Sequence, residues 1–283
     1  MRFRADAPFR DGRAIGGGLS LAADFLFPPA CAVCDAPLDA ADPWNYGRRS
    51  LCTACSARLP WRRTEEMLLP LPSLRYLAFL PARRAHLAER LQALAVFHYE
   101  TPIPELIRRL KFSDQVSLAP AFAEWIAERV RRVLPSDVYE GALLLPLPLS
   151  KSSYRQRAYN QSARIAEALA KRLGLEFRAD ILYKTRDTPR QSESSALQRF
   201  VQSEGAYRAT GNVRGRRIIL LDDILSSGAT LFHAAEALIS AGAEAPMAWV
   251  LASGRKGEDA GARRLSASSG LRNTEGLSIL DEA

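Results

Sequence analysis

The sequence predicts an α/β protein in which a parallel-sheet domain follows a small cysteine-rich module. Strand-like and helix-like stretches alternate between residues 90 and 253, which is typical of a parallel sheet with helices on both faces. The stretch "RRIILLDD" (216–223) contains a continuous apolar run, as in a strand buried on both faces. All four cysteines lie between residues 21 and 62, in two C-x-x-C pairs.

Apolar periodicity and the positions of proline and glycine define the elements of the sheet domain. Apolar residues recur at helical spacing in the helices, prolines end the strand 142–149, and Gly174 can cap the helix before it. In chain order we expect a strand at 94–99, helices at 103–112 and 118–134, a strand at 142–149, a helix at 160–174, a strand at 216–223, a helix at 228–243 and a strand at 245–252.

Composition divides the chain into five regions. A polar, glycine-rich start is expected to be flexible, and a final stretch of serine, glycine and charged residues without periodicity is expected to be disordered. The segment between the cysteines and the sheet domain has prolines and scattered apolar residues and predicts no regular element. The regions are a flexible N-terminus at 1–20, a cysteine module at 21–62, a connecting segment at 63–93, the sheet domain at 94–253 and a tail at 254–283.

Bulk composition limits the classes of function. The chain has 283 residues, of which 47% are hydrophobic and 25% charged, as in globular proteins with one good-sized domain and a smaller module. No apolar run is long enough to span a membrane, and no apolar core follows the first residues as it does in a signal peptide. We therefore expect a cytoplasmic location with reduced thiols. The net charge of +8 favours phosphate-bearing ligands or nucleic acid, or serves solubility alone.

Two adjacent acids, Asp222 and Asp223, end the predicted strand 216–223. In parallel α/β sheets, ligands bind beyond the carboxyl ends of the strands, so these acids are expected to lie in the ligand crevice. A turn of small residues follows and leads into a helix, whose N-terminal N–H groups and dipole attract a phosphate. The turn consists of Ser226, Ser227, Gly228, Ala229 and Thr230.

The acids and the turn serve different parts of one ligand. Carboxylates repel a phosphate but suit the hydroxyls of a ribose, a metal ion, or both, so the pattern predicts a sugar phosphate site. An acid after a buried strand also occurs in P-loop ATPases, but the chain contains no G-x-x-x-x-G-K-[ST] stretch. The remaining alternative is an ordinary capped helix start, which needs neither the second acid nor the run of small residues.

The cysteines form a second predicted site. Two C-x-x-C pairs at this spacing predict a structural zinc ion held by four thiolates, with no position left open for catalysis. Two disulfides or a redox pair fit a reduced compartment poorly, and an iron–sulfur cluster is the main alternative. The four ligands of the predicted zinc ribbon are Cys31, Cys34, Cys52 and Cys55.

The stretch "LLDDILSSGAT" resembles the phosphoribosyl pyrophosphate (PRPP) motif of type I phosphoribosyltransferases. The resemblance implies that Asp222 and Asp223 hold the ribose hydroxyls as the catalytic acids, and that residues 226–230 hold the 5-phosphate. It also implies Mg²⁺ bound together with PRPP. Ser226 and Ser227 replace the usual pair of threonines. The carboxylate that some purine-salvage members carry at the position of Ser226 is absent here.

Together with the zinc ribbon, this motif resembles the ComF family, which is linked to competence and DNA uptake. The stretches "LIRRLKF", "LLLPLPLSKSSYRQRAYNQSARIAEALA" and "TRDTPRQSESSALQRF" also resemble that family, and the similarity covers roughly residues 22–253. Ala158 stands where the family has a glycine. The resemblance implies single-stranded DNA and a DNA-uptake helicase as partners.

A basic segment after the strand 142–149 is the predicted cover for the pyrophosphate. A leaving group with several charges needs cations around it as it departs, and the alternative is a solvated basic face. Within this segment, which we expect as a loop, Ser150, Lys151, Arg155 and Arg157 are predicted to reach the pyrophosphate, and Asn160 and Gln161 to position the loop.

Two kinds of function follow from these sites. The first is an enzyme that transfers the phosphoribosyl group of PRPP with release of pyrophosphate, and no residue identifies the acceptor. The second is a non-catalytic PRPP-sensing module that binds single-stranded DNA. A third function, a zinc-ribbon regulator of transcription, has no support, because the sequence shows no helix-turn-helix signature.

The isolated histidines, of which His233 could approach the ligand, are expected to be packed or exposed. The aromatic residues Trp44, Tyr46 and Trp61 are expected to fill the ribbon.

Overall fold

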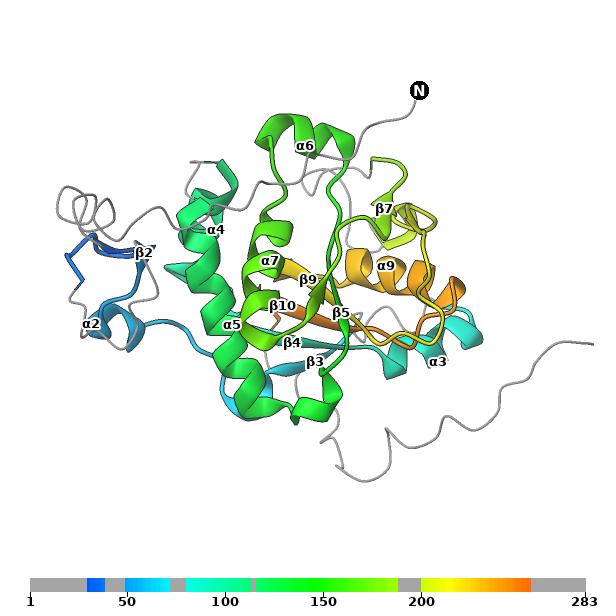
Figure 1. Cartoon of the computed structure of the whole chain (residues 1–283), viewed down its shortest axis with the longest axis horizontal. Coiled ribbons are helices and arrows are strands. Elements are labelled where there is room, and N and C mark those ends of the chain that lie inside the picture. Colours follow the sequence, from blue (N-terminus) through cyan, green and yellow to red (C-terminus); the bar gives the residue numbers. More distant parts are fainter. Residues whose placement is uncertain (1–29, 39–48, 72–79, 113–115, 188–199, 256–283) are drawn as a thin grey trace, which may run out of the picture.

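A six-stranded sheet forms the centre of the computed structural model, which describes residues 30–38, 49–71, 80–112, 116–187 and 200–255 (Figure 1). The strand order is β3-β4-β10-β9-β5-β6. β3 is antiparallel to β4, and every other neighbouring pair is parallel, which confirms the predicted α/β class. The strands are β3 (Leu68–Pro70), β4 (Gln92–His98), β10 (Met247–Ser253), β9 (Ile218–Leu225), β5 (Leu143–Pro146) and β6 (Glu176–Phe177).

Helices cover both faces of this sheet because successive residues of the buried strands point to opposite sides. In β9, Ile219 and Leu221 belong to one buried cluster, together with apolar residues of α5 (Ala119–Val133) and α7 (Gln161–Leu173). Ile218 and Leu220 belong to the other, together with residues of α3 (Ala82–Arg90) and α9 (Ala229–Ser240). The helix α4 (Ile103–Phe112) lies on the α5 side (Figure 1).

Most of the predicted elements are present, with shifted ends. The strand expected at 216–223 runs on to Leu225, whereas the strand expected at 142–149 ends at Pro146. The helix expected at 228–243 begins at Ala229, after Gly228 with φ of 82°. The segment that we expected as a basic loop is in fact a short helix, α6 (Lys151–Arg157), because Ser150 caps its first turn. Its cations therefore project from a helix and not from a loop.

The connecting segment contributes regular structure that the sequence analysis did not predict. Its residues form a 3₁₀ turn (Thr64–Glu66), the antiparallel edge strand β3 and the helix α3. A second small sheet, also not predicted, pairs β7 (Leu182–Lys184) with β8 (Tyr207–Ala209) in antiparallel fashion. At the other end, Arg255 is 6% exposed, so the ordered body includes the first two residues of the region expected as a disordered tail.

The cysteine module lies beside α4 at one end of the domain (Figure 1). It contains the parallel pair β1 (Ala30–Cys31) and β2 (Arg49–Ser50) and the short helix α2 (Thr53–Ser56). The expected N-terminal region 1–20, Trp44 and Tyr46 lie outside the described residues. None of the helices in the described residues has the length and apolarity that a bilayer crossing requires.

An aromatic cluster joins the module to the sheet. The ring of Trp61 lies 4.3 Å from that of Phe97 and 6.3 Å from that of Trp125, measured between centroids. The guanidinium of Arg129 lies over the Trp61 ring at 4.4 Å. Trp61 therefore packs at the boundary between the two parts.

Candidate functional site

The acid pair lies near the carboxyl end of β9 and is bound by two other elements. Asp223 is 4% exposed, and its Oδ2 forms an ion pair with the ammonium of Lys111 at the end of α4. The hydroxyl of Ser162 in α7 donates to Oδ1 of Asp222 at 3.1 Å. The backbone N–H of Asp223 donates to the same oxygen at 2.9 Å. These contacts fix both carboxylates relative to the sheet.

The surroundings of the pair make Asp222 easier to protonate than an ordinary aspartate. Burial and the adjacent negative charge of Asp223 raise the pKa of Asp222 to about 7, against the opposing effect of Lys111 and of its hydrogen bonds. Lys184 in β7 also interacts with Asp222, and burial lowers the pKa of this lysine. Asp222 raises the pKa of Tyr207 in β8, adding to the larger effect of burial on that phenol. Lys184 in β7 and Tyr207 in β8 are therefore close enough to Asp222 to interact with its charge.

The turn of small residues forms the connection from β9 to α9. Gly228 has the left-handed φ of 82° and is the N-cap residue of α9. The N–H of Ala229 donates to Oγ of Ser227 at 3.3 Å, and the carbonyl of Gly228 accepts the first helical bond, from Phe232, at 2.8 Å. The predicted residues 226–230 are therefore contiguous with a helix N-terminus and lie at the same sheet edge as the acids. Because the sequence predicts that they bind a phosphate, we call them the phosphate loop below.

The predicted cover residues lie on α6 and at the start of α7. Oγ of Ser150 accepts from the N–H of Ser153 at 3.2 Å, so it caps α6. The side chains of Lys151 and Arg155 are exposed. Arg157 donates to Oε1 of Gln161 at 3.2 Å and lies over the ring of Phe112 at 5.2 Å.

Asn160 connects the end of β5 to the start of α7. Its Nδ2 donates to the carbonyl of Leu147 at 3.0 Å, and its Oδ1 accepts from the N–H groups of Ser162 and Ala163 at 3.0 and 3.2 Å. The same helix start presents the Ser162 hydroxyl to Asp222. Asn160 thereby places a residue that binds one of the acids.

Ala158 has φ of 62°, in the left-handed region that favours glycine. It ends α6, with its N–H donating to the carbonyl of Tyr154 at 2.8 Å. The glycine that the ComF family carries here would adopt this conformation without a Cβ clash.

Three residues at the acid pair were not among the predicted site residues. Lys111 is the next-to-last residue of "LIRRLKF", a stretch that resembles the ComF family but in which the sequence assigns no site residue. Ser162 and Lys184 carry no local signal, because only the packing of α7 and the β7–β8 sheet brings them to β9.

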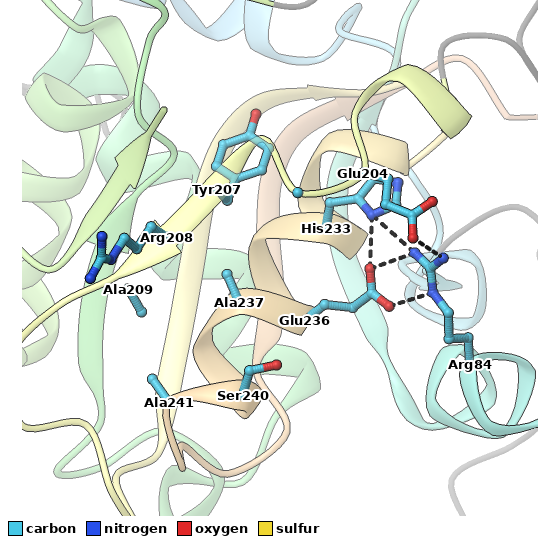
Figure 2. Close-up of a pocket in the computed structure, with 11 residues that line it drawn as sticks. Arg84, Glu204, Tyr207, Arg208, Ala209, His233, Glu236, Ala237, Ser240 and Ala241 are labelled. Carbon is cyan, nitrogen blue, oxygen red and sulfur yellow. Dashed lines mark hydrogen bonds and ion pairs between the residues drawn. The ribbon is translucent and has the colours of Figure 1, made fainter. Parts of the chain in front are cut away.

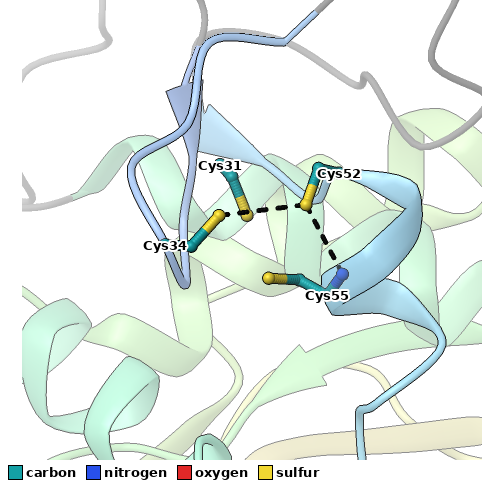
Figure 3. A group of neighbouring side chains, drawn as sticks. All are labelled: Cys31, Cys34, Cys52 and Cys55. Atoms are coloured by element: carbon teal, nitrogen blue, oxygen red, sulfur yellow. Dashed lines mark hydrogen bonds between the residues drawn. The ribbon is translucent and has the colours of Figure 1, made fainter.

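The four cysteines form one cluster (Figure 3). Their sulfur atoms all lie within 4.8 Å of one another, with 3.9 Å between those of Cys34 and Cys52. Cys31 is fully buried, and although burial raises the pKa of its thiol, hydrogen bonds from backbone groups lower it to about 7 overall. Burial and the neighbouring sulfurs raise the pKa of Cys55. Four sulfurs at these separations fit a tetrahedral metal such as zinc, which would bind them as thiolates.

His233 is a packed side chain. It is 3% exposed, its Nε2 lies 2.7 Å from the carbonyl oxygen of Phe200, and its Nδ1 lies 2.8 Å from Oε2 of Glu236. It lines a cavity of about 660 Å³ between α3, α9 and β8, where Arg84 forms ion pairs with Glu204 and Glu236 (Figure 2). The charges in this cavity are therefore largely paired with one another.

The other two histidines lie away from the acid pair. His86 is exposed on α3, with its Nδ1 3.9 Å from Oε2 of Glu89. Nε2 of His98, at the end of β4, lies 3.4 Å from Oε2 of Glu66.

Part of the chain is similar to a known family of domains. Residues 160–273 match the family described as phosphoribosyl transferase domain, and this range contains the acid pair and the phosphate loop. The mostly parallel sheet and this match show a domain with a phosphoribosyltransferase-like fold.

The chain is also similar to proteins whose names refer to DNA use and competence. The chain is 28% identical over 238 residues to DNA utilization protein YhgH of Escherichia coli K12, covering 79% of this chain and 96% of the relative. It is 29% identical over 159 residues to competence protein ComFC of Bacillus subtilis, covering 53% and 59%. These relatives confirm the resemblance to the ComF family.

Solved structures with a matching region include phosphoribosylpyrophosphate synthetase from Mycobacterium smegmatis. The match has a TM-score of 0.30 and 19% identity, and it covers 49% of this chain and 34% of the synthetase.

Proposed function

We propose that this chain binds PRPP and transfers its phosphoribosyl group to an acceptor, with release of pyrophosphate. The observation that carries the proposal is the pairing of two fixed carboxylates with a helix N-terminus at one edge of the sheet. Such an edge is where parallel α/β sheets bind ligands. The acceptor stays open in this proposal.

The phosphate loop is proposed to hold the 5-phosphate. Backbone N–H groups at the start of α9 have no helical acceptor, and the helix dipole adds positive potential there. Gly228 and Ala229 carry little or no side chain, which lets a phosphate approach the backbone. The hydroxyls of Ser226, Ser227 and Thr230 supply further donors.

Asp222 and Asp223 are proposed to accept hydrogen bonds from the ribose hydroxyls. Lys111 and Ser162 hold them in place before the ligand arrives, so little reorganisation accompanies binding. The donor set also fits Mg²⁺ bound through the ligand. Mg²⁺ commonly uses one or two carboxylates together with phosphate oxygens and water, and Lys111 already occupies one oxygen of the pair. The ion would stabilise charge on the pyrophosphate oxygens.

Lys151 and Arg155 on α6 are proposed to stabilise the departing pyrophosphate. In the transfer, the bond between C1 and the pyrophosphate oxygen breaks, and pyrophosphate leaves with the electron pair. A bond from the acceptor forms at C1. Exposed cations on a short helix can approach that leaving group as its charge develops.

A second candidate function is a non-catalytic PRPP-sensing module that binds single-stranded DNA. It is favoured by exposed aromatic rings beside cations: Phe112 is 53% exposed next to Arg157, and Tyr154 is 44% exposed on α6 near Lys151. Rings and cations together suit stacked bases and phosphates. The names of the relatives, DNA utilization protein and competence protein, support a role connected with DNA. The proposal adds a cytoplasmic location and a DNA-uptake helicase as partner.

Titration calorimetry with PRPP and Mg²⁺ tests the binding. We expect wild-type protein to bind, and Asp222→Asn/Asp223→Asn to lose binding. Asp137→Asn, an exposed acid in the turn before β5, is the control and keeps it. No heat with wild-type protein at any divalent ion concentration contradicts the proposal.

A second measurement separates the two candidate functions. Pyrophosphate release from PRPP with a panel of nucleobases, lost in the double variant, supports the transferase. The sensing module predicts no release, with PRPP binding intact and single-stranded DNA binding lowered by Phe112→Ala.

A further inference from the structure

A buried arginine, Arg255, binds the outer side of the phosphate loop. It is the second residue after β10 and is 6% exposed. Its Nε donates to the carbonyl of Ser226 at 2.7 Å, and its Nη2 donates to the carbonyl of Ser227 at 2.6 Å. Its Nη1 donates to the carbonyl of Pro70 at 2.5 Å, at the end of β3. The guanidinium therefore contacts two consecutive peptide groups of the loop.

These contacts determine where the loop N–H groups point. In a planar trans peptide, the C=O and the N–H of the same unit point in opposite directions. The carbonyls of Ser226 and Ser227 face Arg255, so the N–H groups of Ser227 and Gly228 face away from it. Two neighbouring N–H groups aimed to one side, followed by a left-handed Gly228, form an anion-binding concavity. Arg255 thus holds the backbone in the orientation that a phosphate needs.

A second buried arginine, Arg62, holds the backbone that carries Arg255. It is 2% exposed, and its Nη2 donates to the carbonyl of Arg255 at 2.6 Å and lies 3.5 Å from that of Ser253. Its Nη1 donates to the carbonyl of Glu66 at 2.9 Å. Arg62 therefore stabilises the turn after β10 from the side opposite the loop.

Arg62 in turn is fixed at the boundary with the cysteine module. Its N–H donates to the carbonyl of Val96 in β4 at 3.0 Å, and the preceding Trp61 packs on Phe97. The indole N–H of Trp61 donates to the carbonyl of Ser56 in α2 at 2.8 Å. A continuous set of hydrogen bonds and ring contacts thus runs from the module to the phosphate loop.

We propose that Arg255 is a positioning residue for the phosphate loop and that Arg62 keeps Arg255 in place. The inference rests on the proposed binding of a sugar phosphate and adds two residues that do not touch it. A guanidinium is needed because its three nitrogens, spread over one plane, each donate to a different carbonyl, whereas the three protons of an ammonium sit on a single nitrogen. Arg255→Lys therefore keeps the charge and loses the geometry.

The test compares Arg255→Lys and Arg255→Gln with wild-type protein by calorimetry, using ribose 5-phosphate as the probe. Misaligned loop N–H groups lose a hydrogen bond to the charged phosphate, which is worth roughly 10- to 100-fold in affinity, and we expect a loss in that range for both variants. Arg132→Lys is the control. It changes an exposed arginine of α5 that pairs with Glu128, outside the contacts that lead to the loop, and it keeps wild-type affinity.

Amide hydrogen exchange in the free protein supplies a readout that general stability does not reproduce. In Arg62→Lys, exchange at Ser227 and Gly228 is expected to accelerate while exchange within α5 stays unchanged. Wild-type affinity in both Arg255 variants, or unchanged exchange in Arg62→Lys, overturns the inference. Absence of ribose 5-phosphate and PRPP binding in wild-type protein instead overturns the proposed function.

Discussion

Lys111 at the end of α4 and Asp223 in β9 form an ion pair in which both side chains are largely buried, with 16% and 6% of their surfaces exposed. A lysine from a separate helix therefore neutralises one of the two adjacent acids before any ligand binds. Charges in such an environment interact strongly because little water screens them.

Removing Lys111 is expected to destabilise the protein, because a buried carboxylate loses its partner. Lys111→Gln should lower the free energy of unfolding by about 3 kcal/mol, measured by urea denaturation. Lys171→Gln, which removes an exposed cation from α7, serves as the control and should change it by less than about 1 kcal/mol. Adding Asp223→Asn to Lys111→Gln should restore part of the loss. Equal effects of the two lysine substitutions would show that the pair contributes nothing.

The raised pKa of Asp222 predicts a pH-dependent contribution to stability. In the unfolded chain an aspartate titrates near pH 4, whereas in the folded protein Asp222 titrates at about 7. Between those values the folded state binds more protons, so this group favours folding at low pH, and the contribution is lost as pH rises through 7. The charged groups around it are Asp223, Lys111 and Lys184.

Asp222→Asn removes this contribution. Relative to wild-type protein, the variant should gain stability between pH 5 and pH 8, which chemical denaturation in the presence of a chelator measures at both values. A stability difference that is the same at the two pH values contradicts the raised pKa.

Glycine at position 158 is expected to stabilise the protein. A residue other than glycine in the left-handed region costs about 1–2 kcal/mol, and the greater freedom of glycine in the unfolded chain offsets part of the gain. Ala158→Gly should therefore raise the free energy of unfolding by about 0.5–1 kcal/mol. Ala168→Gly, inside α7, should lower it by about 1 kcal/mol, so the two thermal shifts have opposite signs.

The cysteine cluster predicts one zinc ion for each chain. Elemental analysis of purified protein should find about one equivalent, and Cys52→Ser should lower it, because four thiolates close the tetrahedral shell. Chelation should lower the unfolding temperature, since the metal binds the folded arrangement of ligands. Iron in place of zinc, with visible absorption, would favour the iron–sulfur alternative.

Sequence reasoning worked best where the signal is local and contiguous. The strand and turn from Ile218 to Thr230 carry both the apolar run and the small residues in one stretch, so the class and the order of the large elements followed. Helix α6 has no apolar stripe, and β7 and β8 are three residues each, so neither has a periodicity to detect.

Contacts between elements that are distant in the sequence could not be predicted, because they depend on how the chain packs. Ser162 meets Asp222 only because α7 packs against β9, and Lys184 interacts with Asp222 only because the fold brings β7 near it. Arg62 and Arg255 resemble ordinary surface cations in the sequence, because nothing local shows that their guanidinium groups bind buried carbonyls.

The two outermost strands of the main sheet affect how this protein can meet others. Among the described residues, β6 has two residues and β3 has three, and β3 ends at Pro70, which has no N–H to donate. Short or proline-bearing borders give an incoming extended peptide few groups with which to pair. A second chain would accordingly associate through side chains of helices and turns, and fibre-like stacking of the sheets is disfavoured.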